Sequence, residues 1–236
     1  RQFNWALDNL PIKTKWVLRL DADEYLSSEL IETINTKLEL LPPDVTGVIF
    51  KRRHIFFGRW IKNGTYPVCL LRLFQYGKAR CEQRMMDEHM VLLEGHAVEF
   101  EGDFSDHNLS DIGWWTAKHN GYALREAVDI LNIEYGLIEG AEHQSNDIGA
   151  QAAQKRARKA RYARLPLFWR AFAYFLYRYF LRGGFLEGSE GFLWHFLQGW
   201  WYRTLVDAKI FEIKRKSGGD RDKMLTLLRE KYGMKL

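Results

Sequence analysis

The 236-residue sequence lacks the features that identify disulfide-stapled, zinc-binding or membrane-spanning proteins. It has only two cysteines, Cys69 and Cys81, which form neither a C-x-x-C pair nor any metal-ligand spacing. We expect both to be reduced, as in a cytosolic protein. The most apolar run, from Phe168 to Leu181, is too short and too charged for a membrane-spanning helix. Internal repeats and low-complexity segments are also absent from the sequence.

What the sequence does contain fits a globular enzyme. Hydrophobic residues make up 47% and charged residues 28%, which gives a substantial core and an ordinary surface. Aromatic residues reach 15% and concentrate late in the chain, and basic residues cluster after residue 154. At this length, one domain with an appended segment is expected. We therefore divide the sequence into a first domain over residues 1–150 and a basic, aromatic, helical extension over residues 151–236.

Two aspartates follow the first predicted strand. Residues 15–20 are mostly apolar, and Asp21 and Asp23 stand directly after them, at the end of the strand where ligands bind in open α/β sheets. Positions i and i+2 of an extended backbone point to the same side, so both carboxylates can face one hard cation. Such a cation keeps positions open for substrate phosphates. A plain acidic turn is the alternative, because aspartate is common in turns.

Local signals predict the other elements. Pro11 ends a first helix, and Ser27 or Ser28 begins a second that runs to about Leu41. Ser110 or Asp111 caps a long third helix. The remaining predictions are strands over 45–53, 68–74 and 96–104, a loop over 56–66, a helix over 168–181, a turn over 185–191 and an aromatic helix from Phe192.

This order of motifs resembles the family 2 glycosyltransferases. An R-x-x-N-type pattern over Arg1–Asn4, a spacer and the D-x-D strand match that family, and the match continues to about residue 215. The resemblance implies an α/β GT-A fold, a Rossmann-like sheet that binds a nucleotide-sugar donor, here through Arg1, Asn4 and Asp21. It also implies that Asp21 and Asp23 hold Mg²⁺ or Mn²⁺ against the diphosphate. Within that family, the sequence resembles the bacterial transferases of lipopolysaccharide core, O-antigen and capsule assembly. Because the family's first strands precede this region, we expect a sheet that is incomplete at its N-terminus and a longer parent protein.

Two later motifs extend the resemblance. In the family, an acidic residue between the D-x-D strand and the acceptor helix is the catalytic base, and Asp87 and Glu88 stand at that place. The usual Glu-Asp order is reversed, so the choice between them stays open, with Glu88 slightly favoured; an acidic pair at a helix start is the alternative. His107 precedes an aromatic-rich helix and a K-x-x-x-Y pattern, which implies a place in the metal shell. An ordinary hydrogen-bonding histidine is the alternative.

Aromatic rings and cations between the second and third predicted strands suggest an acceptor or phosphate site. Trp60 offers a flat face to a sugar ring, and Arg59 can meet phosphate. A packed loop with ordinary surface cations is the alternative. Arg72 interrupts an apolar strand and should be paired, either with a diphosphate or with a structural carboxylate.

The C-terminal region combines cations with aromatic residues. Arg170, Tyr174, Arg178 and Arg182 recur every fourth residue, which predicts a polar stripe on one helix face, with arginines that attract anionic lipid. With the basic run over residues 151–164, this pattern is typical of an interfacial membrane anchor. A hairpin packed on the catalytic domain, or on a second subunit in a homodimer, is the alternative. Nucleic-acid binding is not expected, because no recognised nucleic-acid motif accompanies the cations.

Together these features predict an inverting, metal-dependent glycosyltransferase. Its acceptor would be a glycan or a lipid-linked glycan in cell-envelope polysaccharide synthesis, and the enzyme would lie on the cytoplasmic face of the cell membrane. One rival function is a non-catalytic, membrane-associated scaffold with a degenerate transferase domain. Another is a nucleotidyltransferase, which also uses paired aspartates and Mg²⁺.

Overall fold

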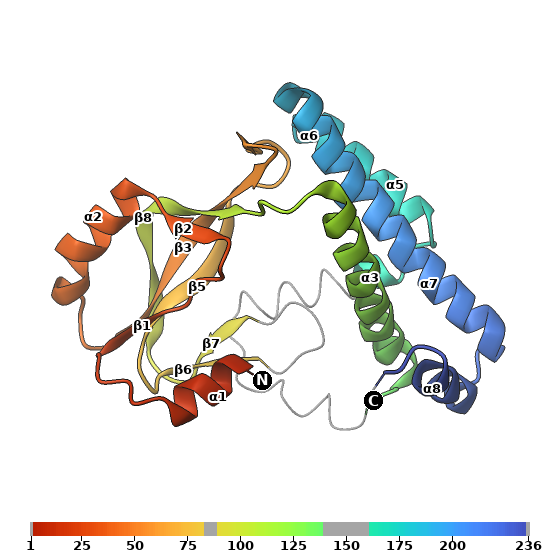
Figure 1. Cartoon of the computed structure of the whole chain (residues 1–236), viewed down its shortest axis with the longest axis horizontal. Helices are drawn as coiled ribbons and strands as arrows, with labels where there is room; N and C mark the ends of the chain where they lie inside the picture. Colours follow the sequence, from red (N-terminus) through yellow and green to blue (C-terminus); the bar gives the residue numbers. More distant parts are fainter. Residues whose placement is uncertain (1, 83–88, 139–160, 235–236) are drawn as a thin grey trace. The chain divides into compact units, whose positions relative to one another are not determined.

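The computed structural model describes residues 2–82, 89–138 and 161–234. The predicted base residues Asp87 and Glu88, and the predicted donor ligand Arg1, lie outside the described residues. The chain forms two compact units (Figure 1). The first, here the α/β unit, comprises residues 1–109 and 182–192; the second, the helical unit, comprises residues 110–181 and 193–236. The first division falls after Leu109, earlier than the boundary at residue 150 that the sequence suggested.

A mixed sheet forms the centre of the α/β unit. Its strand order is β1 (Trp16–Leu18), β5 (Val68–Gln75), β3 (Val45–Phe56), β8 (His96–His107) and β2 (Glu24–Leu26). Strands β3 and β8 are parallel, whereas β5 is antiparallel to both β1 and β3, and β2 is antiparallel to β8. A short β4 (Arg59–Trp60) folds back on the end of β3. The predicted α/β class is confirmed at this level.

Two hydrophobic clusters hold this sheet. Consecutive residues of a strand point to opposite faces, and accordingly the neighbours Leu73 and Phe74 belong to different clusters. On one face, α2 (Ser28–Lys37) and η1 (Leu38–Leu40) pack on β3 and β8 through Leu30, Val48, Phe50, Phe100 and Phe104. The other cluster joins α1 (Gln2–Asn9), β6 (Ala79–Cys81) and β7 (Met90–Leu92), with Leu7, Ala79, Cys81 and Met90 in its core.

The start of α2 is fixed to β8. Ser27 is the N-cap, as predicted, and its hydroxyl accepts a hydrogen bond from the Leu30 N–H at 3.2 Å. The Ser27 N–H also donates to the Asp103 carbonyl at 2.9 Å. Gly102 lies beside this contact with φ of +87°, and a Cβ there would stand 2.6 Å from the Leu30 nitrogen. Only glycine lets β8 pass this close to the helix.

The helical unit is built around α3 (Ile112–Tyr135) and α7 (Tyr202–Ser217), which pack against each other. Their buried side chains include Ala127 and Leu131 of α3 and Val206 and Ile210 of α7. Asp111 caps α3 by accepting from the Trp114 N–H at 2.8 Å. Further helices among the described residues of this unit are α5 (Trp169–Leu176), the π-helical segments η2 (Tyr177–Leu181) and η4 (His195–Trp201), and α8 (Arg221–Glu230).

Two expectations for the C-terminal region are wrong. The predicted turn at 185–191 is helical, because η3 (Gly184–Glu187) leads directly into α6 (Gly188–Trp194). The predicted lipid-facing stripe is wrong for two of its arginines, which turn inward: the exposed fraction is 2% for Arg170 and 5% for Arg178, whereas Arg182 is exposed. None of the helices within the described ranges has the length and apolar content that a membrane span requires.

Candidate functional site

The D-x-D segment forms a tight turn between β1 and β2. The Glu24 N–H donates to the Asp21 carbonyl at 3.0 Å, so the chain reverses over Ala22 and Asp23. The side chains of Asp21 and Asp23 belong to exposed residues at the carboxyl end of β1. Because β2 pairs with β8, the His107 N–H donates to the Asp23 carbonyl at 2.9 Å. The structure therefore places the predicted residue His107 next to the predicted pair of aspartates.

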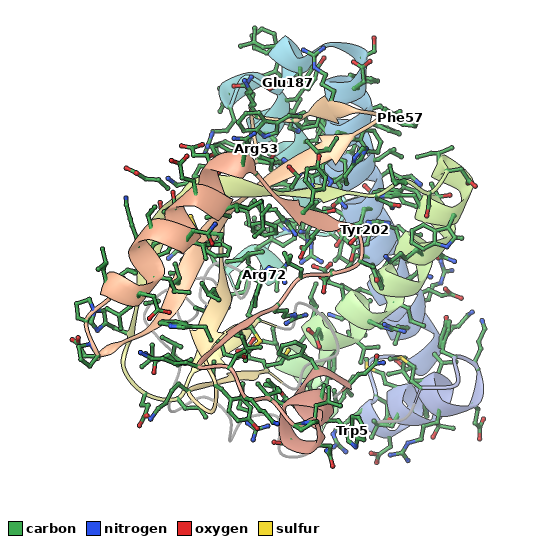
Figure 2. The ribbon with its side chains drawn as sticks, turned by 60° about the vertical axis from the view of Figure 1, so that its left-hand side comes forward. Trp5, Arg53, Phe57, Arg72, Glu187 and Tyr202 are labelled. Carbon is green, nitrogen blue, oxygen red and sulfur yellow. The ribbon has the colours of Figure 1, made fainter. Side chains whose placement is uncertain are left out.

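A buried ion pair braces this turn from below. Glu24, the first residue of β2, forms an ion pair with Arg72 of β5, and both side chains are buried (Figure 2 labels Arg72). The second oxygen of the Glu24 carboxylate accepts a hydrogen bond from the Asp21 N–H at 2.9 Å. The Arg72 guanidinium lies over the Phe104 ring, 5.1 Å from its centroid, and one nitrogen stands 3.8 Å from the Asp21 carboxylate. Arg72 thus has the structural carboxylate that was one of its two predicted partners.

Burial is the main cause of the pKa shifts of both members of this ion pair. Burial raises the pKa of the Glu24 carboxyl, while the hydrogen bond from the Asp21 N–H and the charge of Arg72 act in the opposite direction. Burial likewise lowers the pKa of the Arg72 guanidinium, against the attraction of Glu24 and Asp21. Glu24 was not predicted as a bracing residue, although the charge of Arg72 in an apolar strand indicated that it would be paired, either with a diphosphate or with a structural carboxylate.

The same edge of the sheet carries a second set of charges. Strands β3 and β8 are parallel, so their carboxyl ends meet here, with His54 opposite Asp106. The Asp106 carboxylate lies 3.4 Å from Nδ1 of His54 and 3.3 Å from Nη1 of Arg52. Burial would raise the pKa of Asp106, but the hydrogen bond and charge of His54, with the charges of Arg52 and Arg72, outweigh it and hold the pKa below its ordinary value.

Asp103 of β8 organises the neighbouring loop. Its carboxylate accepts from Nε of Arg53 at 2.7 Å and from the Tyr66 hydroxyl at 2.9 Å. Burial, together with this hydrogen bond, raises the pKa of the Tyr66 phenol. Arg53 and Lys62 each lie over the half-buried Trp60 ring, 4.4 Å from its centroid. The Trp60 ring is therefore packed among cations, next to the edge of Tyr66.

Glu187, which the sequence did not single out, fixes this loop to the segment over 182–192. Its buried carboxylate accepts from the Asn63 N–H at 2.8 Å, from the Asn63 side-chain amide at 2.7 Å and from the Lys62 N–H at 3.1 Å. Arg59 stands 3.6 Å from Glu187 and 3.8 Å from Glu190. Figure 2 labels Arg53 and Glu187. The charge of Arg59 thus faces two carboxylates, and its role with phosphate stays a prediction.

Asn4 and the cysteines have structural partners. The Asn4 amide donates to the Cys81 carbonyl at 2.8 Å and accepts from the Cys81 N–H at 2.9 Å, which ties α1 to β6. A role for Asn4 in donor binding stays a prediction. Cys69 and Cys81 are not joined in a disulfide, and Nη1 of Arg19 donates to Sγ of Cys81 at 3.2 Å.

The donor set at the turn suits a hard cation that is completed by substrate. Within the described ranges, no three His, Cys, Asp or Glu side chains are arranged to hold a metal ion. Two carboxylates one residue apart do fit Mg²⁺, which is usually bound by one or two carboxylates together with substrate phosphates and water. No protein-family model and no solved structure matches this chain.

Proposed function

We propose that the α/β unit belongs to an inverting, metal-dependent glycosyltransferase of GT-A type that uses a nucleotide-sugar donor. The observation that carries the proposal is the turn over Asp21 and Asp23 at the carboxyl end of β1, joined to His107 by a 2.9 Å backbone hydrogen bond. These are the three residues that the resemblance assigns to the diphosphate end of the donor. Their meeting at one edge of the sheet supports that assignment.

Asp21 and Asp23 would hold Mg²⁺ or Mn²⁺, with His107 beside them. The cation, when bound, neutralises charge on the departing nucleoside diphosphate. Glu24 and Arg72 act through the turn: they hold its backbone and place a guanidinium 3.8 Å from the Asp21 carboxylate. The positive charge of Arg72 near the turn reduces the electrostatic repulsion between the acidic side chains and the diphosphate.

The reaction is a single displacement. The oxygen of an acceptor hydroxyl forms a bond to the anomeric carbon as the bond from that carbon to the diphosphate oxygen breaks, which inverts the configuration. The acceptor proton passes to a carboxylate base, proposed at Glu88 or Asp87, and the bonding electrons leave with the diphosphate. Arg59 and Trp60 are proposed to contact the acceptor or its phosphate.

We further propose that the acceptor is a glycan or a lipid-linked glycan of the cell envelope, and that the protein works at the cytoplasmic face of the membrane. Both statements follow from the resemblance and from the cationic, aromatic C-terminal region. An acceptor on lipid would be reached most easily by an enzyme held at the bilayer surface.

Product analysis tests the proposal. The full protein is incubated with a panel of nucleotide-sugars and Mn²⁺, and the products are identified by mass spectrometry. Release of a nucleoside diphosphate with transfer or hydrolysis of the sugar is expected, and should be lost in Asp23→Asn. Asp44→Asn is the matched control, because this aspartate is exposed and precedes β3 far along the chain from the turn.

Other products would contradict the proposal. Pyrophosphate release would identify a nucleotidyltransferase instead. No turnover of any donor by the folded protein would favour the non-catalytic scaffold. Full activity in Asp23→Asn would remove the cation from this turn.

A further inference from the structure

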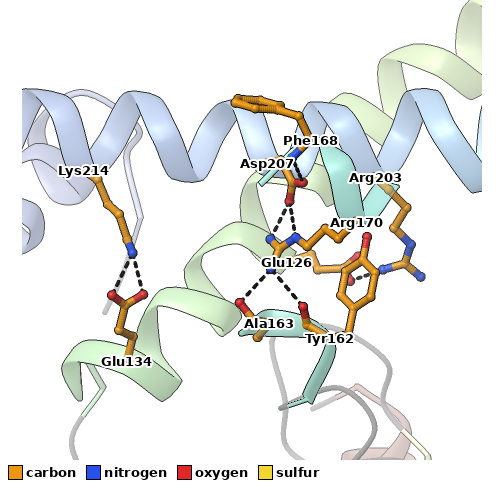
Figure 3. A network of polar contacts seen from close by, with 9 residues as sticks. All are labelled: Glu126, Glu134, Tyr162, Ala163, Phe168, Arg170, Arg203, Asp207 and Lys214. Atoms are coloured by element: carbon orange, nitrogen blue, oxygen red, sulfur yellow. Dashed lines mark hydrogen bonds and ion pairs between the residues drawn. The ribbon is translucent and has the colours of Figure 1, made fainter. Parts of the chain in front are cut away.

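The helix formed by α5 and η2 is amphipathic in the reverse sense to that expected in water. Its arginines point inward: Arg170 is bonded to the carboxylate of Asp207 on α7 and donates to the Ala163 carbonyl at 2.9 Å (Figure 3). Arg178 is also buried and lies over the Tyr174 ring, 5.4 Å from its centroid. A surface helix normally presents its charged side chains to solvent, whereas the arginines of this helix are buried inside the helical unit.

Large apolar side chains take the outer positions. The exposed fraction reaches 74% for Trp169 and 79% for Leu181. Trp169, Leu176 and Phe180 recur at spacings of seven and four, so they share one side of the helix. The exposed apolar residues here, which we name the aromatic face, are Leu165, Phe168, Trp169, Leu176, Tyr177, Phe180 and Leu181. Scattered exposed apolar residues are normal, but a contiguous group marks an interaction surface.

Exposed cations precede the aromatic face. The sequence has no Asp or Glu from residue 148 to residue 186. Arg161 and Arg164 are exposed just before the helix. Because Arg170 pairs with Asp207 inside the helical unit, these two exposed arginines set the sign of the charge at the start of the face. The complement of this surface is apolar, with anionic groups beside its start.

We propose that the aromatic face lies in the headgroup boundary of an anionic lipid bilayer, with Arg161 and Arg164 on lipid phosphates. Trp, Tyr and Phe are the side chains that favour this boundary, and arginine adds attraction to anionic lipid. The helix lies along the surface in this arrangement. The proposal concerns binding alone and does not depend on the transferase activity.

A second copy of the chain fits this surface less well. In a two-fold dimer the same face meets itself. The segment between 148 and 186 has no acidic residue, so it offers no counter-charge to Arg161 and Arg164 of the other copy. A bilayer rich in anionic lipid supplies the missing negative charge.

Vesicle co-sedimentation tests the proposal with two kinds of variant. The full protein is mixed with phosphatidylcholine vesicles, with or without phosphatidylserine, at low and high salt. Trp169→Ala/Leu181→Ala should weaken partitioning about tenfold or more at either salt concentration, because it removes apolar burial. Arg161→Gln/Arg164→Gln should lose about fivefold per arginine, only with phosphatidylserine and mainly at low salt.

Matched controls separate the face from general exposure. Trp5→Ala/Leu40→Ala removes an exposed tryptophan and an exposed leucine of the α/β unit and should leave partitioning unchanged. Circular dichroism verifies that every variant is folded, which is expected because the altered side chains lie on the surface. Sedimentation velocity on the same samples reports self-association.

Three outcomes would overturn the proposal. The first is that the unaltered protein ignores phosphatidylserine vesicles at low salt. The second is that Trp169→Ala/Leu181→Ala binds vesicles as well as the unaltered protein does. The third is a stable dimer that dissociates in that variant while vesicle binding is absent, which would assign the aromatic face to a second copy.

Discussion

The buried pair of Glu24 and Arg72 leads to an asymmetric prediction about stability. The two side chains touch beneath the D-x-D turn, and burial disfavours the charged form of each. Removing the cation leaves a carboxylate that must either stay ionised in the core or bind a proton. Removing the negative charge leaves an arginine that can still donate to a neutral acceptor. We therefore expect Arg72→Met to be much more harmful at neutral pH than Glu24→Gln.

The protonation route sets the size of the effect. The pKa of this carboxyl in the unfolded state is 4.5, which is 7 − 4.5 = 2.5 units below pH 7. Protonating the carboxyl at pH 7 costs the free energy that corresponds to this difference. At 1.36 kcal/mol per unit this is about 3 kcal/mol, which is the loss of stability expected for Arg72→Met. Glu24→Gln keeps an oxygen that accepts from the Asp21 N–H, and it leaves Arg72 with the Asp21 carboxylate 3.8 Å away as a counter-charge, so its change should stay within about 1 kcal/mol. Combining the two substitutions removes both charges and should recover most of the loss.

The pH dependence follows from the raised pKa of Glu24. Between the unfolded value of 4.5 and the higher folded value, the folded state binds more protons than the unfolded state. The stability contributed by this group is therefore complete below pH 4.5 and falls as pH rises. Without Arg72 the pKa of Glu24 in the folded state rises further, so the pH range over which this stability is lost becomes wider. The loss in Arg72→Met should be about 3 kcal/mol at pH 7 and should nearly vanish at pH 4.

Urea unfolding at pH 4, 5.5 and 7 measures these differences, with hydrogen exchange in peptides of β2 and β5 to report on the α/β unit alone. The difference in unfolding free energy between variant and unaltered protein at each pH cancels the contributions of the other groups that titrate. Arg80→Met is the control, because Arg80 pairs with Asp8 at 2.5 Å but both side chains are substantially exposed; it should cost under about 1 kcal/mol. An equal loss for Arg72→Met at pH 4 and pH 7 would refute the reasoning.

Four other substitutions test separate parts of the protein. Glu187→Ala removes the acceptor of three hydrogen bonds and should cost about 1–3 kcal/mol, seen as faster amide exchange at Asn63. Asp207→Asn leaves the Arg170 guanidinium buried without its counter-charge and should destabilise the helical unit by about 3–5 kcal/mol in urea; an unchanged midpoint would contradict this. In single-turnover assays, one of Glu88→Gln and Asp87→Asn should slow transfer by about 10²–10⁴-fold with donor binding kept, and two silent variants would exclude this motif.

Local signals in the sequence were sufficient for much of the α/β unit. The Ser27 cap, the apolar strand over 68–74 and the position of Asp21 and Asp23 after a strand all depend on neighbouring residues, and the structure has them as expected. The short strands β2, β6 and β7 were missed, because three residues give too little periodicity to be recognised.

Long-range partners could not be predicted from the sequence. A spacing of four puts Arg170 and Arg178 on one helix face, but only Asp207, on another helix, decides that this face turns inward. Glu187 likewise finds Asn63 far away in the chain. The charge at position 72 indicated a partner without deciding between a diphosphate and a carboxylate, and the structure shows Glu24.

Cation-dependent binding of a nucleoside diphosphate tests the central claim most directly. Isothermal titration of the full protein with a panel of nucleoside diphosphates, with Mn²⁺ and with a chelator, compares the unaltered protein with Asp23→Asn and Asp44→Asn. We predict binding of one diphosphate that requires Mn²⁺, is lost in Asp23→Asn and is retained in Asp44→Asn. Equal binding with the chelator, or undiminished binding in Asp23→Asn, would contradict the assignment of a cation and donor site to this turn.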